Sequence, residues 1–135
     1  MNVIVDTVIW SLALRRSDPD ERVCHELTQL IEEQRVLLLG PVRQEILSGY
    51  SEESKFELLR NHLSCFADEP ILDEDYIRAA QYHNLCRRKG IQGSHIDFLI
   101  CSCSFRLQAA IYTRDQDFQQ YSKVLPILLH QEDRR

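Results

Sequence analysis

Hydrophobic positions in this chain form short unbroken runs that alternate with longer segments of helical periodicity. Unbroken apolar runs lie within residues 2–5, 35–40 and 109–113. They predict buried strands, because a strand that is covered on both faces is apolar throughout. Residues 65–72 and 123–128 are weaker strand candidates, and Pro70 confines the first of these to a sheet edge or a strand end.

Between the apolar runs, hydrophobic residues recur at spacings typical of amphipathic helices. The predicted helices cover residues 7–14, 17–34, 41–49, 51–63, 74–90 and 95–107. Asp73 and Ser94 are the expected N-caps of the last two helices, and Gly90 is expected just after the end of the fifth. Strands that alternate with helices predict an α/β protein, a three-layer α/β/α sandwich with a central, mostly parallel sheet.

Length and composition favour a single domain over residues 1–135, since 44% of the residues are apolar and 27% are charged. The five cysteines are an odd number scattered through apolar segments, which indicates free thiols in a reducing compartment. We see no secretion signal at the N-terminus, and no apolar stretch approaches the ~20 residues that span a bilayer. We therefore expect no membrane association and a cytoplasmic location.

Four carboxylates lie close to the ends of the predicted strands. Asp6 directly follows the first strand, and Asp115 comes two residues after the third. Glu45 lies one turn into the helix after the second strand, and Asp97 lies in the first turn of its own helix. Ligands of open α/β sheets bind beyond the carboxyl ends of the strands, so we expect these side chains to converge at one rim.

Each acid also has a purely local explanation. Asp6 could cap the helix that follows it, and Asp97 could form a capping box with Ser94. Glu45 could be a solvated helix residue, and Asp115 could be an ordinary turn residue. Only their common placement favours a shared function.

Clustered carboxylates repel one another and raise each other's pKa unless a cation neutralises them. Mg²⁺ and Mn²⁺ prefer hard oxygen ligands, and such an ion can activate a water for in-line attack on a phosphodiester. The net charge of −5 argues against nonspecific binding to polyanions. Any role on nucleic acid must therefore depend on local features.

The acids lie in four ordered segments, VIVDTVIWS, PVRQEILSG, HIDFLICSCS and IYTRDQDF, which contain Asp6, Glu45, Asp97 and Asp115 respectively. In this order and spacing, the segments resemble the motifs of PIN-domain nucleases, from Asn2 to about Leu128. The length and the glycine-terminated second segment further resemble the VapC toxins of bacterial toxin–antitoxin pairs. The resemblance implies a Mg²⁺- or Mn²⁺-dependent endoribonuclease that cleaves RNA, a cognate antitoxin that blocks its site, and a homodimer.

Carried over residue by residue, the resemblance assigns Asp6, Glu45 and Asp97 to the core metal-binding acids. Asp115 matches the fourth and more variable acid, and Asp117 is an alternative to it. All of these assignments are implied by the family and are to be compared with the structure.

Hydroxyl and basic side chains beside the acids are further candidates. Thr7 and Thr113 match hydroxyl positions that could hold waters or orient carboxylates. Arg43 and Arg114 are the best candidates for contacts with RNA phosphates, because each is close in sequence to a proposed acid. The other basic residues considered, Arg15, Arg16, Arg87, Arg88 and Lys89, are more typical of a solvated surface. Val8 departs from the family, which often has a small polar residue there.

Other functions are compatible with an aspartate after the first strand. A phosphotransfer receiver expects an acidic pair near that strand end, and an aspartate-nucleophile phosphatase expects a second aspartate where this chain has Val8. Two alternatives remain within the resemblance, a non-catalytic PIN-like binding domain and a PIN nuclease of RNA processing. A small neighbouring gene that encodes a DNA-binding N-terminus would favour the toxin.

Overall fold

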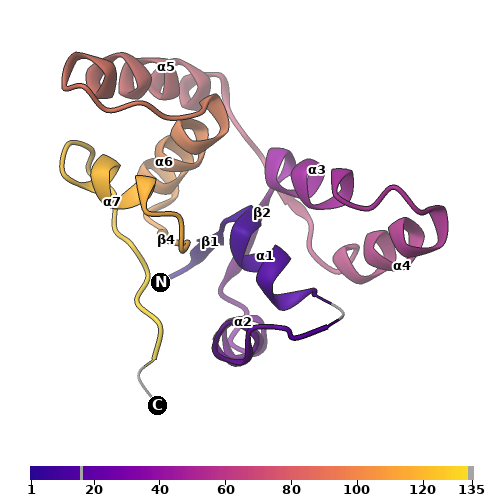
Figure 1. Ribbon diagram of the computed structural model, residues 1–135. Helices are drawn as coiled ribbons and strands as arrows, with labels where there is room; N and C mark the ends of the chain where they lie inside the picture. The colour runs from indigo at the N-terminus through magenta and orange to yellow at the C-terminus, as the bar shows by residue number, and fades with distance from the viewer. Residues whose placement is uncertain (16, 134–135) are drawn as a thin grey trace.

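Among the described residues, four short strands form one parallel sheet at the centre of the molecule (Figure 1). The strands are β1 (Val3–Val5), β2 (Val36–Leu39), β3 (Asp68–Glu69) and β4 (Ala110–Tyr112). Their order is β3-β2-β1-β4, and every neighbouring pair is parallel. This computed structural model describes residues 1–15 and 17–133, so that Arg16 lies outside the described residues.

Helices connect and cover the strands. They are α1 (Thr7–Ala13), α2 (Glu21–Glu32), α3 (Gly40–Ser48), α4 (Glu53–Leu63), α5 (Asp73–Arg88), α6 (His95–Leu107) and α7 (Asp117–Ser122). In Figure 1, α5 and α6 lie on one side of the sheet and α1 and α2 on the other. The predicted α/β/α arrangement around a parallel sheet is thereby confirmed.

The core explains why the short apolar runs become strands. All three residues of β1 and all three of β4 are buried, because helices cover both faces of these strands. Helix α6 is buried over seven consecutive residues, from Phe98 to Ser104, as expected for a helix enclosed between the sheet and α5. Burial of each large apolar side chain contributes about 1.5–3 kcal/mol, which holds the carboxyl ends of the strands at fixed positions.

The predicted strand at residues 123–128 is not observed. Leu129 instead forms a single parallel bridge with Ile111 of β4. The backbone amide of Leu125 still donates to the carbonyl of Tyr121, so the turn that ends α7 uses the donors that a strand would need. The carbonyl of Leu128 accepts a hydrogen bond of 2.9 Å from the N–H of Ile111, so the chain reaches the sheet edge only at the last residue of the predicted segment.

The predicted N-cap of α5 is also wrong. Asp73 is the first residue of the helix, and the N-cap position belongs to Leu72. The carboxylate of Asp75 accepts a hydrogen bond of 2.9 Å from the backbone N–H of Leu72 and thus supplies the capping interaction. Asp75, the third residue of the helix, thus supplies the reciprocal half of a capping box, whereas the N-cap side chain itself makes no capping hydrogen bond.

The other end signals are confirmed. Ser94 is the N-cap of α6, and its Oγ accepts a hydrogen bond of 3.1 Å from the backbone N–H of Asp97. Gly90 follows the C-cap of α5 with a φ of 79°, a left-handed conformation that favours glycine. The strand next to Pro70 is the two-residue β3, at the sheet edge. No helix in the described ranges is long and apolar enough to cross a membrane.

Candidate active site

Asp6 connects the ends of β1 and β4, which are neighbours in the sheet. It follows β1 and caps α1, since its Oδ1 accepts a hydrogen bond of 2.8 Å from the backbone N–H of Thr7. Its Oδ2 accepts a second bond of 2.8 Å from the hydroxyl of Thr113, the residue after β4. Asp6 is only 7% exposed. The local capping explanation is therefore correct, but it accounts for only one of the two carboxylate oxygens.

The loop after β4 presents two further acids. The hydroxyl of Thr113 accepts a hydrogen bond of 3.0 Å from the backbone N–H of Asp115. Asp115 in turn accepts a bond of 2.9 Å from the backbone N–H of Asp117 through its Oδ1. Both interactions are turn contacts, as the local explanation expects. The second interaction also fixes the direction of the Asp115 carboxylate.

Asp97 completes the closest group of acids. One carboxylate oxygen from each of Asp97, Asp115 and Asp117 lies within 4.8 Å of the others. Asp97 comes from the first turn of α6, whereas the other two come from the loop after β4 and the start of α7. The predicted convergence of Asp97 with Asp115 is therefore observed, and Asp117 lies beside Asp115 rather than away from the site.

Glu45 meets the site through Thr7. The Thr7 hydroxyl donates a hydrogen bond of 2.8 Å to Oε1 of Glu45, and the backbone N–H of the same residue donates to Asp6. Glu45 is an exposed residue of α3, as its local explanation predicted, yet its side chain is directed by this contact. Asp6 and Glu45 thus form a second part of the site, beside the group of Asp97, Asp115 and Asp117.

The electrostatics of the site disfavour full ionisation. Burial raises the pKa of Asp6 to about 6, an effect to which the charges of Asp97 and Asp115 add and which the hydrogen bonds of Thr113 and Thr7 oppose. Burial also raises the pKa of Asp97, and the charges of Asp115 and Asp117 raise it further. In the described part of the chain, no salt bridge joins Asp6, Asp97 or Asp115 to a basic side chain.

These residues fit a hard divalent cation. The donors at the site are carboxylate and hydroxyl oxygens, which Mg²⁺ and Mn²⁺ prefer. A cation among Asp97, Asp115 and Asp117 would offset their repulsion and the cost of burying Asp97. The chemistry of the donor set therefore agrees with the metal that the sequence resemblance implies.

The guanidinium of Arg43 is engaged within the chain. Its Nε lies 2.7 Å from Oδ1 of Asp68, and its Nη1 donates to the carbonyl of Leu63 at 3.0 Å. Nη2 donates to the carbonyl of Phe66. These bonds tie α3 to the connection between α4 and β3, so an RNA phosphate would have to replace at least one of them.

Arg114 is also paired, although it precedes Asp115. Its Nη1 lies 2.7 Å from Oδ2 of Asp20, and its Nε lies 2.9 Å from Oε1 of Glu132. The three residues join the loop after β4 to the start of α2 and to the C-terminal segment. A contact of Arg114 with RNA stays a prediction, and it requires exchange of an existing partner.

Tyr121 contacts an acid of this site but lies outside the four sequence motifs. Its hydroxyl donates a hydrogen bond of 2.7 Å to Oδ2 of Asp97. Tyr121 belongs to α7 and looks in the sequence like an ordinary core residue, which it also is. The one available signal is its position four residues after Asp117, which places both side chains on one face of the helix.

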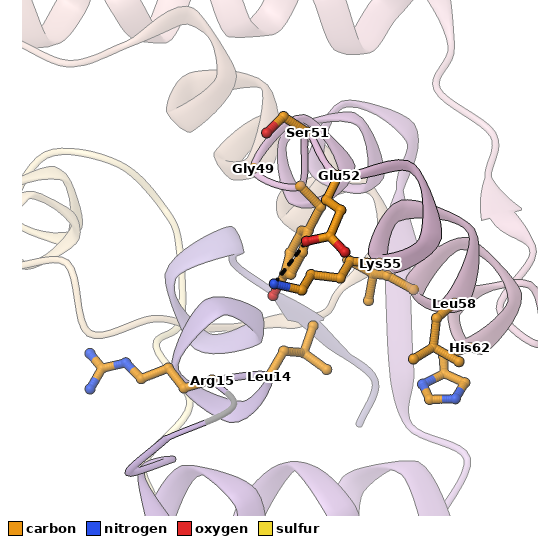
Figure 2. A pocket seen from close by; sticks show the side chains of 10 residues that line it. Leu14, Arg15, Gly49, Ser51, Glu52, Lys55, Leu58 and His62 are labelled. Carbon is orange, nitrogen blue, oxygen red and sulfur yellow. Dashed lines mark ion pairs between the residues drawn. The ribbon is translucent and has the colours of Figure 1, made fainter.

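A groove lies to one side of the acids, between the end of α1 and helices α3 and α4. Figure 2 shows Leu14 and Arg15 on one side of it, facing Lys55, Leu58 and His62. The cavity measures about 530 Å³. Its floor is largely apolar, and its margin carries Arg15, His62 and the ion pair of Lys55 with Glu52, whose atoms Nζ and Oε2 lie 3.1 Å apart.

Comparison with known proteins identifies the family of this fold and site. Residues 3–124 match the PIN domain family. The chain therefore belongs to the PIN domain family, as its four motifs predict.

Solved structures show the same fold. FitAcB from Neisseria gonorrhoeae is 23% identical, the alignment covers 96% of both chains, and the TM-score is 0.78. VapBC2 from Rickettsia felis, bound to a DNA fragment from their promoter, is 18% identical over 98% of this chain and 100% of that chain, with a TM-score of 0.79. VapBC-1 from nontypeable Haemophilus influenzae is 17% identical over 98% of both chains, with a TM-score of 0.73.

Proposed function

We propose that this PIN-domain protein is a Mg²⁺- or Mn²⁺-dependent endoribonuclease and the toxin of a toxin–antitoxin pair. The observation that carries the proposal is the group of Asp97, Asp115 and Asp117, with three carboxylate oxygens within 4.8 Å and no basic partner among the described salt bridges. Membership of the PIN domain family and the fold shared with VapBC structures support it.

The residues of the site would have two roles, to hold the cation and to orient the carboxylates. Asp97, Asp115 and Asp117 would hold the cation, with Asp6 and Glu45 beside them. When bound, the cation would lower the pKa of a water and offset negative charge that develops on the phosphate. Thr113 and Thr7 hold the two oxygens of Asp6 in place, and Thr7 also orients Glu45. Because Glu45 is exposed, its Oε2 can accept a hydrogen bond from solvent or substrate.

The ends of the cleaved RNA test this chemistry. Hydrolysis by an activated water should leave a 5′-phosphate and a 3′-hydroxyl, and EDTA should stop it. The experiment incubates purified protein with RNA and Mn²⁺ and sequences the ends, with Asp97→Asn as the inactive control. Cyclic 2′,3′-phosphate ends that form in EDTA would contradict the proposal, and absence of cleavage by the native protein would favour a non-catalytic PIN-like domain.

The antitoxin would dock in the groove of Figure 2. Leu14, Leu58 and Leu59 offer an apolar surface for an amphipathic helix or an extended segment, and Arg15 at the margin suits an acidic residue that flanks it. Gly49 lines this groove and also the depression that contains Thr7 and Glu45. A partner seated on the apolar floor would therefore lie next to the depression of Glu45, where an Arg or Lys would pair with that carboxylate.

A charge placed in the groove should prevent this docking. Leu58 is 53% exposed, so Leu58→Asp should leave the fold intact. We expect this variant to bind the antitoxin at least about tenfold more weakly than the native protein. Leu128→Asp, at a residue 55% exposed and outside the groove, is the matched control. Mn²⁺ should compete with the partner. An equal loss in both variants, or no competition by metal, would place the partner elsewhere.

A homodimer is also part of the proposal. Leu72, Tyr76 and Ile77 at the start of α5 expose large apolar side chains, and Phe105 of α6 does the same. A second copy of the chain could cover them. Sedimentation of the native protein and of Ile77→Asp tests this, because the variant should be monomeric at concentrations where the native protein is dimeric.

A further inference from the structure

Tyr121 contacts Asp97 from a helix that carries another acid of the site. Its phenol donates to Oδ2 of Asp97 at 2.7 Å, as described above. We propose that Tyr121 is a positioning residue, which fixes the Asp97 carboxylate in the orientation needed for the divalent cation. The proposal rests on the metal-dependent function proposed above.

The ring of Tyr121 has little freedom to move. The residue is fully buried, and its ring centroid lies 4.9 Å from that of Phe98 and 5.1 Å from that of Phe118. These aromatic contacts come from α6 and from α7 itself. A hydroxyl on an enclosed ring stays where the packing places it, and a hydrogen bond to an ionised carboxylate is about twice as strong as a neutral one.

Gly93 closes the other side of the hydroxyl. A Cβ at this position would lie 2.8 Å from Cζ of Tyr121 and 2.9 Å from Cε2 of Phe98, and closer still to the tyrosine hydroxyl. Real Cβ atoms do not approach other heavy atoms to such distances. The loop before α6 therefore packs directly on the phenol, which is confined between the backbone of Gly93 and the carboxylate of Asp97.

The position of Tyr121 in α7 relates two acids to each other. Asp117 lies in the first turn of α7, and Tyr121 follows four residues later on the same face. The helix thus presents one carboxylate of the group and also holds a second one, Asp97, by hydrogen bonding. Loss of the hydroxyl would leave the Asp97 carboxylate with Ser94 as its remaining hydrogen-bonding partner among the described residues, and so less restricted, while Asp115 and Asp117 keep their turn contacts.

Tyr112 offers a matched comparison within the same chain. It is only 1% exposed, and its hydroxyl donates a hydrogen bond of 2.8 Å to Oε1 of Glu132, outside the group of acids. Tyr112→Phe and Tyr121→Phe each remove one buried phenol hydroxyl from a carboxylate. A general effect on stability should therefore appear in both variants, whereas an effect on the cation should appear only in Tyr121→Phe.

The experiment measures Mn²⁺ affinity of the full chain after removal of metal with EDTA. Calorimetric titration and the electron paramagnetic resonance signal of free Mn²⁺ give the dissociation constant for the native protein and both variants. We expect Tyr121→Phe to weaken Mn²⁺ binding roughly 10–100-fold, as is typical when a hydrogen-bonding partner of a metal ligand is lost. Tyr112→Phe should bind Mn²⁺ like the native protein.

The Mn²⁺ affinities distinguish failure of the positioning role from failure of the proposed function. If the native protein binds Mn²⁺ and Tyr121→Phe binds it equally well, the positioning role is wrong and the proposed function is unaffected. If the native protein binds no Mn²⁺, the proposed function fails and this inference with it. Gly93→Ala is a second variant, which displaces the phenol without removing it and should also weaken Mn²⁺ binding. Native affinity in Gly93→Ala would overturn the role assigned to the packing of Gly93.

Discussion

Asp75 of α5 and Asp6 at the end of β1 are both buried carboxylates, but their surroundings differ in charge. Asp75 is fully buried, and Nε of Arg106 lies 2.9 Å from both of its oxygens, with Nη1 of Arg78 at 3.2 Å. Asp6 is 7% exposed, and the hydrogen bonds that it accepts from the described residues come from neutral groups, the hydroxyl of Thr113 and the backbone N–H of Thr7.

The pKa values of the two acids reflect this difference. Burial would raise the pKa of Asp75, but hydrogen bonds from Arg106 and from the backbone of Leu72 outweigh burial and hold it below its usual value. At Asp6, burial is not outweighed, and the pKa rises to about 6. Asp75 is paired with two arginines and joins helices α5 and α6. Asp6 has no cationic side chain among its described partners, so its carboxylate is available to a ligand.

The largest expected effect concerns cleavage. Asp97→Asn should reduce the rate of Mn²⁺-dependent RNA cleavage by about 10²–10⁴, because metal chemistry contributes several kcal/mol and each 1.36 kcal/mol changes the rate tenfold. Asp6→Asn should have a similar effect, and Asp115→Asn a smaller one. Asp75→Asn, assayed where it is folded, should cleave at a nearly native rate. Native rates in Asp97→Asn would reject the proposed site.

The next effect concerns stability at the charged pair. Asp75→Asn should lower the free energy of unfolding by about 3–5 kcal/mol, because it leaves Arg78 and Arg106 without their buried counter-charge. Urea unfolding monitored by circular dichroism measures this loss. A loss below about 1 kcal/mol would mean that the carbonyl partners of the arginines, Pro70 and Ser102, suffice to hold them.

Asp6→Asn should have the opposite sign. The folded-state pKa of Asp6 is about 6 and its usual value is 3.8, so the folded protein loses stability as pH rises through this range. Without metal at pH 7.5, Asp6→Asn should therefore raise the free energy of unfolding by roughly 1–3 kcal/mol. Urea unfolding at pH 7.5 and at about pH 4.5 measures this gain in the free energy of unfolding. The gain at about pH 4.5 should be less than half of the gain at pH 7.5. A gain that does not change with pH would have another cause.

The smallest effect concerns the arginines beside the motifs. If Arg114 contacts an RNA phosphate, Arg114→Ala should reduce the slope of log affinity against log salt concentration by about 1. The measurement uses an RNA that Asp97→Asn binds without cleaving. Arg43→Ala tests the same prediction for Arg43. An unchanged slope would show that the bonds of Arg114 to Asp20 and Glu132 serve the fold alone.

Much of the architecture follows from local patterns in the sequence. The apolar runs predicted three of the four strands, since a strand covered by helices on both faces must be apolar throughout. The end signals Ser94 and Gly90 are correct because capping depends on nearby backbone groups. Asp73 was mispredicted as the N-cap because the helix already begins after Leu72, whose N–H donates to Asp75. The strand at residues 123–128 was mispredicted because the N–H groups of Val124 and Leu125 donate to Tyr121 in the turn after α7.

The sequence by itself determined the buried strands, the family motifs and the positions of Asp6 and Asp115 after strands and of Asp97 in a first helical turn, because apolar runs and helix phase are local properties. Only the tertiary structure decided which charges are compensated. Arg43 and Arg114 are close to acids in sequence but pair elsewhere, and Tyr121 reaches Asp97 across 24 residues. Such contacts depend on how helices pack in space, for which sequence spacing carries no direct signal.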